Sequence, residues 1–236
     1  MTGARRVSLV VLVVVLVAGA FVGGYAARRV PSTTTSSTTV PVTSTTAPVT
    51  PSTSDATWMS LWPDTATVVR YDSPTTVALA FAHRVLRMTS PVAQPFQQGD
   101  TRSGEVPIEP DRTGPTTIVL VRQLASDASW WVLGAIGGSV QIDAPEQFAT
   151  VSSPLRVSGR STAFEAVVNL ALYQDGSSSA LAEGTAMGGS MGEMGPYATT
   201  LSFASPSRHY GVLVVYTRSA KDGSVLEASA IRVRFA

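Results

Sequence analysis

Three carboxylates are the first residues in this chain whose types and spacing could do chemistry. Glu105, Glu109 and Asp111 cluster around a predicted hairpin. Paired carboxylates can serve a hydrolase as acid, base or nucleophile, and their separation sets the mechanism. Acidic residues in turns are more often solvated, and nothing in the neighbouring sequence predicts a cleft around them. A hydrolase site at this hairpin is therefore an alternative interpretation rather than the leading one.

The two histidines lie far apart in the sequence. His83 falls within a predicted helix, and His209 stands at the start of a predicted strand. Neither has a second ligand at a metal-binding spacing such as i, i+4. The chain also has no cysteine, which excludes disulfides and thiolate-bound metals. The sequence thus predicts no catalytic residue, no cofactor and no metal site.

A glycine-rich segment, MGGSMGEMG at residues 187–195, holds further candidates. Ser190 lies in a Gly-Ser-x-Gly context but lacks the preceding apolar strand of a nucleophile elbow. Met187, Met191 and Met194 carry thioethers, which select soft metals such as Cu(I). A hairpin loop that contains methionine, or one that touches an apolar partner, explains the pattern more simply. We expect a loop without chemistry here.

Trp130 and Trp131 are adjacent in a predicted strand. Successive side chains of a strand point to opposite faces. We therefore expect one of the two in the core and the other available as a contact residue, because tryptophan is enriched at binding surfaces.

The elements that would position these residues form a small α+β domain at 57–143. Ser73-Pro74 predicts the start of a helix, which then carries an apolar stripe and ends before Ser90-Pro91. Runs rich in β-forming residues predict strands at 105–108, 116–122, 130–136 and 140–142. One helix on a small antiparallel sheet is the natural packing solution. The stripe consists of Val77, Phe81, Val85 and Met88.

Residues 144–236 alternate apolar and polar side chains, as half-buried strands do. The stretch 164–173 predicts such a strand with Phe164 in the core, and Asp175-Gly176 predicts the turn after it. The stretch 210–216 is apolar on both faces, which indicates a central strand. Turns every 8 to 15 residues indicate a two-sheet sandwich. The other predicted strands are 155–159, 180–185, 197–203 and 226–235.

Several ordered motifs in this half resemble a known family. They run from Ile142 to Pro145, through Val151-Ser152-Ser153-Pro154-Leu155, Val157-Ser158-Gly159 and Phe164-Glu165, to Ser219-Ala220-Lys221-Asp222-Gly223-Ser224. Their series resembles the bacterial spore-germination immunoglobulin-like domain, over roughly residues 142–235. The resemblance implies an extracytoplasmic β-sandwich module that accompanies other domains and has no known catalytic residues. It also implies a structural rather than catalytic role for Glu165.

The first 30 residues predict a transmembrane signal anchor. Val7 to Ala27 is an uncharged run bracketed by Arg5-Arg6 and Arg28-Arg29. At about 1.5 Å per residue it spans roughly 30 Å, the thickness of a hydrocarbon core. The alternative is a signal peptide cleaved near Ala20, since Ala18-Gly19-Ala20 has the small-x-small form of a cleavage site. We favour the anchor, because the apolar run continues past that site.

Residues 31–56 predict a disordered linker. Ser, Thr and Pro make up 20 of its 26 residues, so it lacks the apolar groups that would offset the entropy of ordering. Extended like polyproline, it would reach up to about 80 Å from the membrane. The same composition is typical of O-glycosylated stalks, and glycosylation stays an open alternative. With the N-terminus inside the cell, the linker and both domains would be extracytoplasmic.

The net charge of +1 is unevenly distributed. The basic excess lies in residues 1–56, where four arginines flank the apolar run and Asp55 is the one acidic residue. Residues 57–144 carry a net charge of −2, and the remainder is balanced. Neither predicted domain is basic, so nucleic acid is not an expected partner.

Together these features predict a non-catalytic, membrane-anchored module of the bacterial cell envelope. It would present its immunoglobulin-like domain to a protein or cell-wall partner. The alternatives place a site in the 57–143 domain, as an envelope hydrolase at the carboxylates above or as a ligand-sensing protein with an apolar pocket between helix and sheet. A filled core and such a pocket have the same sequence pattern.

Overall fold

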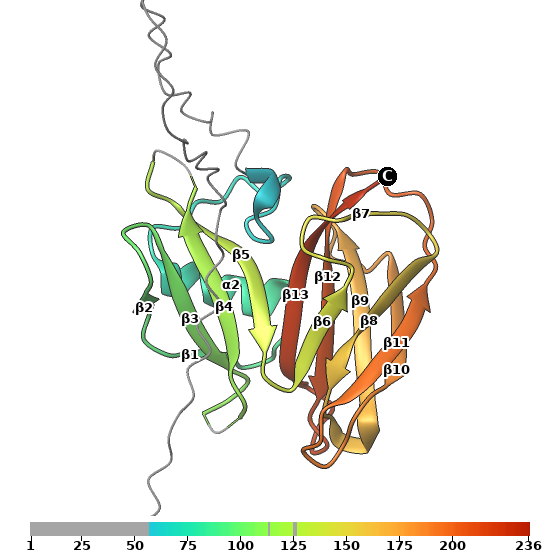
Figure 1. Ribbon diagram of the computed structural model, residues 1–236. Coiled ribbons are helices and arrows are strands. Elements are labelled where there is room, and N and C mark those ends of the chain that lie inside the picture. Colours follow the sequence, from blue (N-terminus) through green and yellow to red (C-terminus); the bar gives the residue numbers. More distant parts are fainter. Residues whose placement is uncertain (1–56, 113, 125–126) are drawn as a thin grey trace, which may run out of the picture. The chain divides into compact units, whose positions relative to one another are not determined.

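The computed structural model describes residues 57–236 apart from residues 113, 125 and 126 (Figure 1). The predicted membrane anchor at 1–30 and the linker at 31–56 lie outside the described residues and stay predictions. Within the described part of the chain, no helix is both long and apolar enough to span a bilayer. Residues 57–143 and 144–236 belong to the same compact unit.

Helix α2 (Pro74–Arg84) begins where the sequence predicts. Ser73 is the N-cap, its hydroxyl accepts a hydrogen bond from the Thr76 N–H at 3.4 Å, and Pro74 takes the first helical position. The helix ends at Arg84, and the next residues form a loop, 85–89. The buried face of the helix consists of Val77, Ala78, Phe81 and Ala82. A short 3-10 turn, η1 (Thr57–Met59), precedes it.

The strands form two sheets. The larger has the order β1-β3-β4-β5-β13-β12-β9-β10, with β2 paired to β3 and β7 paired to β13. The smaller has the order β11-β8-β6. The first strands are β1 (Val92–Ala93), β2 (Gln97–Gln98), β3 (Ser103–Glu109), β4 (Thr117–Gln123) and β5 (Trp130–Gly137). They are followed by β6 (Val140–Ala144), β7 (Thr150–Val151), β8 (Leu155–Ser161), β9 (Val167–Gln174), β10 (Ala182–Met187), β11 (Gly195–Leu201), β12 (Tyr210–Arg218) and β13 (Val225–Phe235).

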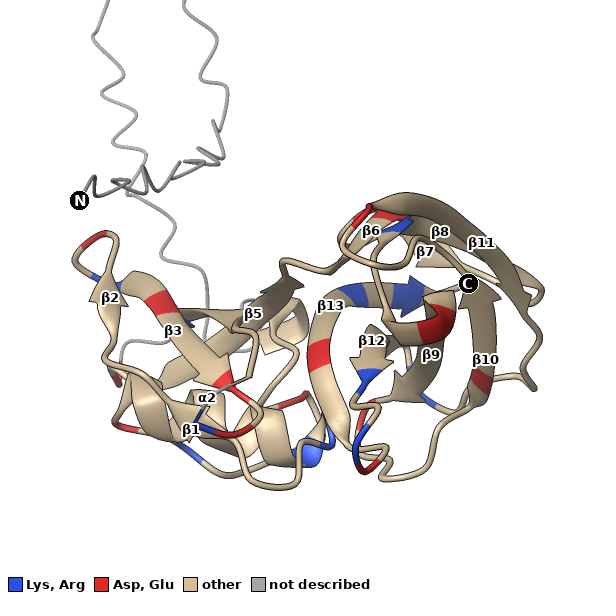
Figure 2. Cartoon of the chain, turned by 90° about the horizontal axis from the view of Figure 1, so that it is seen from below, with Lys and Arg blue, Asp and Glu red and all other residues tan. Residues whose placement is uncertain are grey.

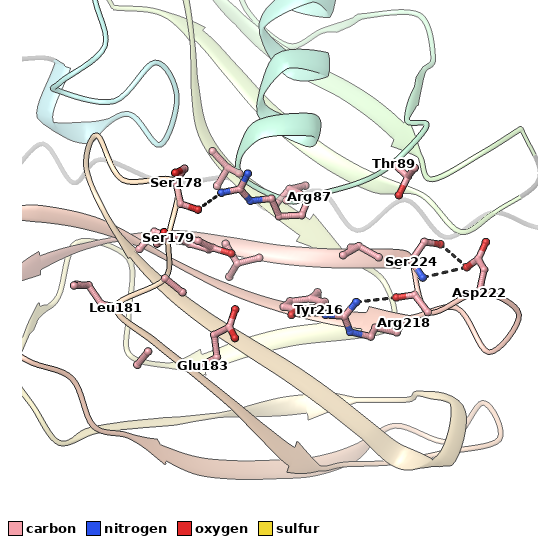
Figure 3. Close-up of a pocket in the computed structure, with 18 residues that line it drawn as sticks. Arg87, Thr89, Ser178, Ser179, Leu181, Glu183, Tyr216, Arg218, Asp222 and Ser224 are labelled. Atoms are coloured by element: carbon pink, nitrogen blue, oxygen red, sulfur yellow. Dashed lines mark hydrogen bonds between the residues drawn. The ribbon is translucent and has the colours of Figure 1, made fainter.

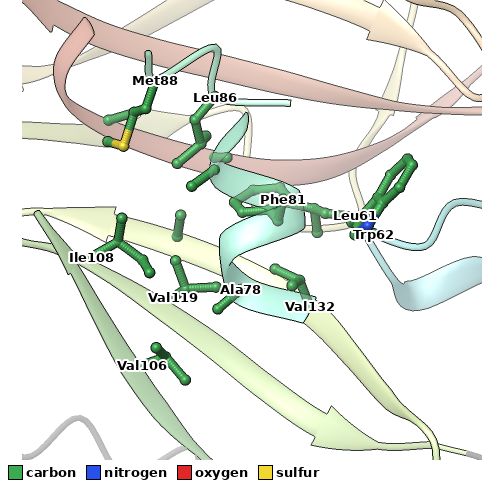
Figure 4. Packing of buried hydrophobic residues seen from close by; sticks show 14 of the residues in the cluster. Leu61, Trp62, Ala78, Phe81, Leu86, Met88, Val106, Ile108, Val119 and Val132 are labelled. Carbon is green, nitrogen blue, oxygen red and sulfur yellow. The ribbon is translucent and has the colours of Figure 1, made fainter. Parts of the chain in front are cut away.

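Two hydrophobic clusters lie on opposite faces of the larger sheet. The helix-side cluster packs α2 against strands β3, β4 and β5 (Figure 4). The sandwich cluster fills the space between the larger sheet and the three-stranded sheet. This second cluster confirms the predicted C-terminal β-sandwich. Prominent side chains of the helix-side cluster are Leu61, Phe81, Leu86, Ile108, Val119 and Val132, and those of the sandwich cluster are Val157, Leu170, Leu172, Leu213, Val215 and Val233.

Strand β12 contributes to both clusters. Val212 and Val214 belong to the helix-side cluster, whereas Leu213 and Val215 belong to the sandwich cluster. The strand is hydrogen-bonded to β13 on one side and β9 on the other. The predicted central strand is therefore confirmed. One continuous sheet thus crosses from the strands before residue 143 to those after it.

A buried ion pair attaches the segment before α2 to the sandwich. The guanidinium of Arg232 on β13 donates to both carboxylate oxygens of Asp175, at 2.5 and 2.6 Å, and its Nε donates to the Trp58 carbonyl at 2.8 Å. Asp175 also accepts bonds from the Thr65 N–H and hydroxyl. The Arg232 side chain has no exposed surface and lies over the Tyr210 ring, 5.2 Å from its centroid. Both charged groups of this buried ion pair therefore have hydrogen-bond partners within the fold.

Glu227 makes a second buried connection, between β13 and the turn from β5 to β6. Its carboxylate accepts hydrogen bonds from the Gly138 N–H and from the Ser139 N–H and hydroxyl. Nearby, the Gly137 N–H donates to the Ser229 hydroxyl at 2.9 Å. The turn that leads from the helix-covered strands into the sandwich is therefore held by β13.

The prediction that Phe164 lies in the sandwich core is wrong. Residues Phe164–Ala166 form a 3-10 turn, η2, in which Glu165 and Ala166 have positive φ angles of 54° and 60°. Strand β9 begins only at Val167, and Phe164 is 63% exposed. The left-handed backbone interrupts the alternation that the sequence pattern implies. From Val168 onward the predicted inward positions hold.

Candidate functional site

A cleft of about 800 Å³ opens between loop 85–89 and the larger sheet (Figure 3). Its floor is formed by strands β9, β10 and β12, and its walls by loop 85–89, the loop between β9 and β10, and the turn between β12 and β13. A volume of this size falls within the range of about 300–1,000 Å³ typical of small-ligand sites. We refer to it below as the cleft.

The floor is the part of the sheet face that α2 does not cover. The register places Glu183 opposite Ala171, and Ala171 opposite Val214. Tyr173 follows Ala171 by two residues on β9, and Tyr216 follows Val214 by two residues on β12. Because side chains alternate along a strand, both rings lie on the same face of the sheet as Glu183. Helix α2 ends at Arg84, and at this end of the sheet Glu183, Arg218 and the two tyrosine rings lie beside the buried Val214 and Val225.

Arg218 is oriented on the floor by its neighbours. One guanidinium nitrogen, Nη1, donates to the Gly223 carbonyl at 2.7 Å, and Nη2 donates to the Tyr216 hydroxyl at 3.1 Å. The guanidinium carbon lies 5.1 Å from the centroid of the Tyr216 ring, a cation–π distance. Burial raises the pKa of Tyr216 above its ordinary value, so its phenol, already protonated at neutral pH, also keeps its proton in mildly alkaline solution.

Arg87 crosses the cleft from the opposite wall. It has a left-handed backbone, with φ of 61°, just after the helix ends. Its Nη2 donates to the Ser178 carbonyl in the loop between β9 and β10, and its guanidinium carbon lies 5.7 Å from the Tyr173 ring centroid. The strained residue thus brings a second cation to the cleft and joins two of its walls.

The turn between β12 and β13 forms the third wall. Asp222 accepts hydrogen bonds from the Ser224 N–H at 3.0 Å and from the Ser224 hydroxyl at 2.7 Å. The hydrogen bond from the Ser224 hydroxyl is the main cause that lowers the pKa of Asp222 below its ordinary value. Gly223 follows with φ of 74°, a conformation that favours glycine. This turn holds the carbonyl that orients Arg218.

The β-sandwich and its turns match a known protein family. Residues 139–224 match the model of the immunoglobulin-like domain of bacterial spore germination. The predicted resemblance is confirmed. Comparison with curated proteins and with solved structures gave no match. The immunoglobulin-like domain supplies Tyr173, Tyr216 and Arg218, whereas loop 85–89 lies outside the matched residues.

Of the three carboxylates of the sequence analysis, Glu105 and Glu109 do not line the cleft, and Asp111 lines a depression next to it. Glu105 and Glu109 are on β3, four residues apart on one face of the strand and hence about 13 Å apart along it. This distance exceeds the separation of roughly 5–9.5 Å between paired carboxyl groups in glycosidases. Asp111 borders a different depression, of about 380 Å³, together with Lys221 and Asp222. The structure does not bring the three carboxylates into one site.

The histidines and the methionine-rich loop also lie outside the cleft. His83 is exposed on α2, with its ring Nδ1 3.2 Å from the Met88 carbonyl, and His209 is exposed before β12. Over the described residues, no three His, Cys, Asp or Glu side chains gather as metal ligands would. Met187 and Met191 are 65% and 97% exposed. Ser190 lies beside Met191 in a shallow apolar depression that Phe164 also lines.

One of the two tryptophans is buried, as predicted, but the other is only partly exposed. Trp131 is 1% exposed, with the Arg70 guanidinium 5.0 Å from its ring centroid. Trp130 is half-buried and meets the Phe96 ring edge-on at 5.3 Å, so much of its surface is used within the fold. The helix-side cluster fills the space between α2 and the sheet where a ligand-sensing pocket was the alternative (Figure 4).

Sequence reasoning missed the residues that line the cleft. Tyr216 and Arg218 are two positions apart at the end of a strand, immediately before the Asp222-Gly223 turn. That spacing places both side chains on one face beside the turn. The contribution of Arg87 carries no comparable signal, because it depends on the point at which α2 ends.

Proposed function

We propose that this protein is a non-catalytic binding module of the bacterial cell envelope. Its apolar N-terminal segment anchors it in the membrane, its linker extends it outward, and the immunoglobulin-like domain presents the cleft to a cell-wall or protein partner. The observation that carries this proposal is the cleft itself, whose size and mixed polar and aromatic lining suit ligand recognition.

The arrangement of hydrogen bonds in the cleft supports binding rather than reaction. Arg218 and Arg87 are each held by a main-chain carbonyl and a tyrosine ring before any ligand arrives. Pre-oriented donors lower the entropic cost of association. The Asp222 carboxylate accepts hydrogen bonds from Ser224 within the turn, which is a structural role and not that of a catalytic base. The charged groups are therefore placed for recognition.

Acidic and basic positions are interspersed over both halves of the described chain (Figure 2). The turn between β12 and β13 carries Lys221 and Asp222, and Arg218 ends the strand before it, so both signs occur at this end of the cleft. Such mixing disfavours a polyanionic partner such as nucleic acid. It supports an envelope ligand recognised by individual side chains.

The absence of cysteine from the natural chain allows a direct test. The full chain with Ser179→Cys carries a single thiol on the cleft wall, which can be labelled with a photoactivatable cross-linker and incubated with isolated cell envelopes. A covalent adduct with an envelope component is expected. The matched control is Thr200→Cys, an exposed position on β11 in the smaller sheet. Equal labelling from both positions, or none from Ser179→Cys, would contradict a binding role for the cleft.

The predicted topology is tested separately on intact cells. A protease added outside should digest the folded domains of the anchored chain, and carbonate extraction should leave the chain in the membrane fraction. Protection of the chain from external protease would contradict the extracytoplasmic placement, and its release by carbonate would contradict the anchor.

A further inference from the structure

We infer that the ligand of the cleft is an uncharged oligosaccharide segment, recognised through side chains centred on Arg218 and Tyr216. This inference rests on the proposed function and specifies its ligand class. It is argued from four properties of the cleft: the pairing of its floor strands, its charge balance, its hydroxyl groups and its apolar patches.

The first property is that the two central strands of the floor, β9 and β12, offer no free main chain. Strand β12 is paired on both sides, by β13 and β9, and β9 is likewise paired by β12 and β10. A peptide that binds by strand addition needs an unpaired edge, because main-chain hydrogen bonds supply its affinity. Over β9 and β12 those groups are already used. Over these two strands, recognition must therefore come from side chains and from the surrounding loops.

The second property is that the charges lining the cleft balance. Two cations, Arg87 and Arg218, are accompanied by two carboxylates, Glu183 and Asp222. A polyanion such as a phosphate-linked polymer gains most of its affinity from a surplus of cations, which this cleft does not have. The planar guanidinium groups instead offer several directed N–H donors, and the carboxylates offer acceptors. This combination suits a ligand that is polar but uncharged.

The third property is the density of hydroxyl groups. A hydroxyl both donates and accepts, so it can pair with a sugar hydroxyl in either direction. The phenol of Tyr216 is especially well placed, since it accepts from Arg218 and keeps its own proton to donate. The hydroxyl-bearing residues that line the cleft are Thr89, Tyr173, Ser178, Ser179, Tyr216 and Ser224.

The fourth property is that apolar surface lies between these polar groups. The partly exposed side chains of Leu181, on the wall, and of Tyr173 and Tyr216, on the floor, supply this surface. A sugar ring presents C–H groups on its faces and hydroxyls around its edge, and burial of C–H surface against apolar side chains is favourable. The alternation of apolar patches with hydroxyls in the cleft matches that division.

The probe is the tetrasaccharide of N-acetylglucosamine, titrated calorimetrically into the full-length chain in detergent micelles. Saturable binding is expected, with an affinity that changes by less than about twofold between 50 and 500 mM salt, because a neutral ligand is not affected by screening. Tyr216→Phe keeps the ring and removes the hydroxyl, so it should weaken binding about 5- to 10-fold. Arg218→Gln should weaken it by at least as much.

Arg156→Gln is the matched control, because Arg156 is exposed on β8 in the smaller sheet. It should leave the affinity unchanged. Absence of tetrasaccharide binding would overturn the inference, as would binding that Tyr216→Phe and Arg218→Gln do not weaken. So would tighter binding of a glycerol-phosphate polymer, abolished by salt, or of a mixed tetrapeptide.

The two proposals fail in different ways. If the tetrasaccharide does not bind but Ser179→Cys still forms its envelope adduct, the ligand class is wrong and the binding role stands. If Ser179→Cys forms no adduct, the binding role itself fails. Circular dichroism of each variant distinguishes loss of binding from loss of fold.

Discussion

The same pair of side chains, an arginine over a tyrosine ring, occurs at both ends of one sheet face. Arg232 lies 5.2 Å from the ring of Tyr210, and Arg218 lies 5.1 Å from the ring of Tyr216. Arg232 is fully buried and bonded to the carboxylate of Asp175, whereas Arg218 is exposed and bonded to a carbonyl and a phenol.

The difference shows that the covering segment, and not the residue pair, decides the role. The segment before α2 lies over the first pair and adds the Trp58 carbonyl, while Asp175 neutralises the charge. No described segment covers the second pair in the same way, because α2 ends at Arg84 and leaves that end of the face as the cleft. Arg232 therefore stabilises the fold, and Arg218 is available to a ligand.

Removal of the carboxylate from the buried pair should have the largest effect. Asp175→Ala leaves the Arg232 guanidinium buried without its counter-charge, and we expect a loss of about 3–5 kcal/mol in the free energy of unfolding. Urea unfolding followed by tryptophan fluorescence measures this loss. Asp100→Ala, which removes an exposed ion pair with Arg122 and a hydrogen bond from the Arg102 N–H, is the control and should cost much less than Asp175→Ala. Similar losses in both variants would break the comparison.

A second buried carboxylate sharpens the comparison. Glu227→Ala leaves the N–H groups of Gly138 and Ser139 without an acceptor, and we expect a loss of about 1–3 kcal/mol. Glu183→Ala, at an exposed position on the cleft floor, should change the free energy of unfolding by no more than about 0.5 kcal/mol. Urea titrations of the two variants give these values. If Glu183→Ala proves as costly as Glu227→Ala, the cleft side chains also carry the fold.

Alkaline pH should act on the buried tyrosines. Burial raises the pKa of the Tyr197 phenol above its unfolded value of about 10, and its hydroxyl donates to the Gln141 carbonyl at 2.7 Å. The unfolded chain releases this proton first, so the stability that it contributes is complete below pH 10 and declines as the pH rises toward the folded pKa.

Tyr197→Phe should therefore flatten the decline in unfolding midpoint between pH 9 and 11 relative to the unmodified chain. The variant should also lose about 1 kcal/mol at pH 7, because it lacks the hydrogen bond to Gln141. Burial also raises the pKa of Tyr216, and this tyrosine is present in both the variant and the unmodified chain. Identical pH profiles would show that Tyr197 does not contribute to the alkaline decline.

The smallest effect on stability is expected at the exposed pair of Arg218 and Tyr216. Arg218→Gln removes an exposed guanidinium and should change the free energy of unfolding by no more than about 0.5 kcal/mol, although it weakens ligand binding. Urea unfolding at pH 7 tests this value. A loss of several kcal/mol would show that Arg218 supports the turn between β12 and β13 as Arg232 supports the other end of the sheet.

Much of the local structure follows from the residues alone. Ser73-Pro74 determines where α2 starts, because a capping hydroxyl and a preset φ angle act within one turn of the helix. The apolar run on both faces at 210–216 requires a central strand, since both of its faces must be covered. The ordered motifs from Ile142 to Ser224 identified the family of the sandwich.

Other features depend on contacts that local patterns do not encode. Phe164 keeps the alternating pattern of a strand yet lies outside the core, because Glu165 and Ala166 adopt left-handed conformations that the pattern cannot reveal. The predicted division at residues 143 and 144 describes how the elements follow one another along the chain. It contains no information about which strands pair, and β13 joins the sandwich to β5.

The sequence by itself determined most of the longer strands, the start of α2 and the family of the second half, because these properties depend on neighbouring residues and on their periodicity. Only the tertiary structure decided that Asp175 meets Arg232 across 57 positions, and that Arg87 reaches Ser178 across 91. These partners meet because a ten-stranded sheet brings distant segments onto one face. The length of α2 then determines which part of that face is buried and which part stays open as the cleft.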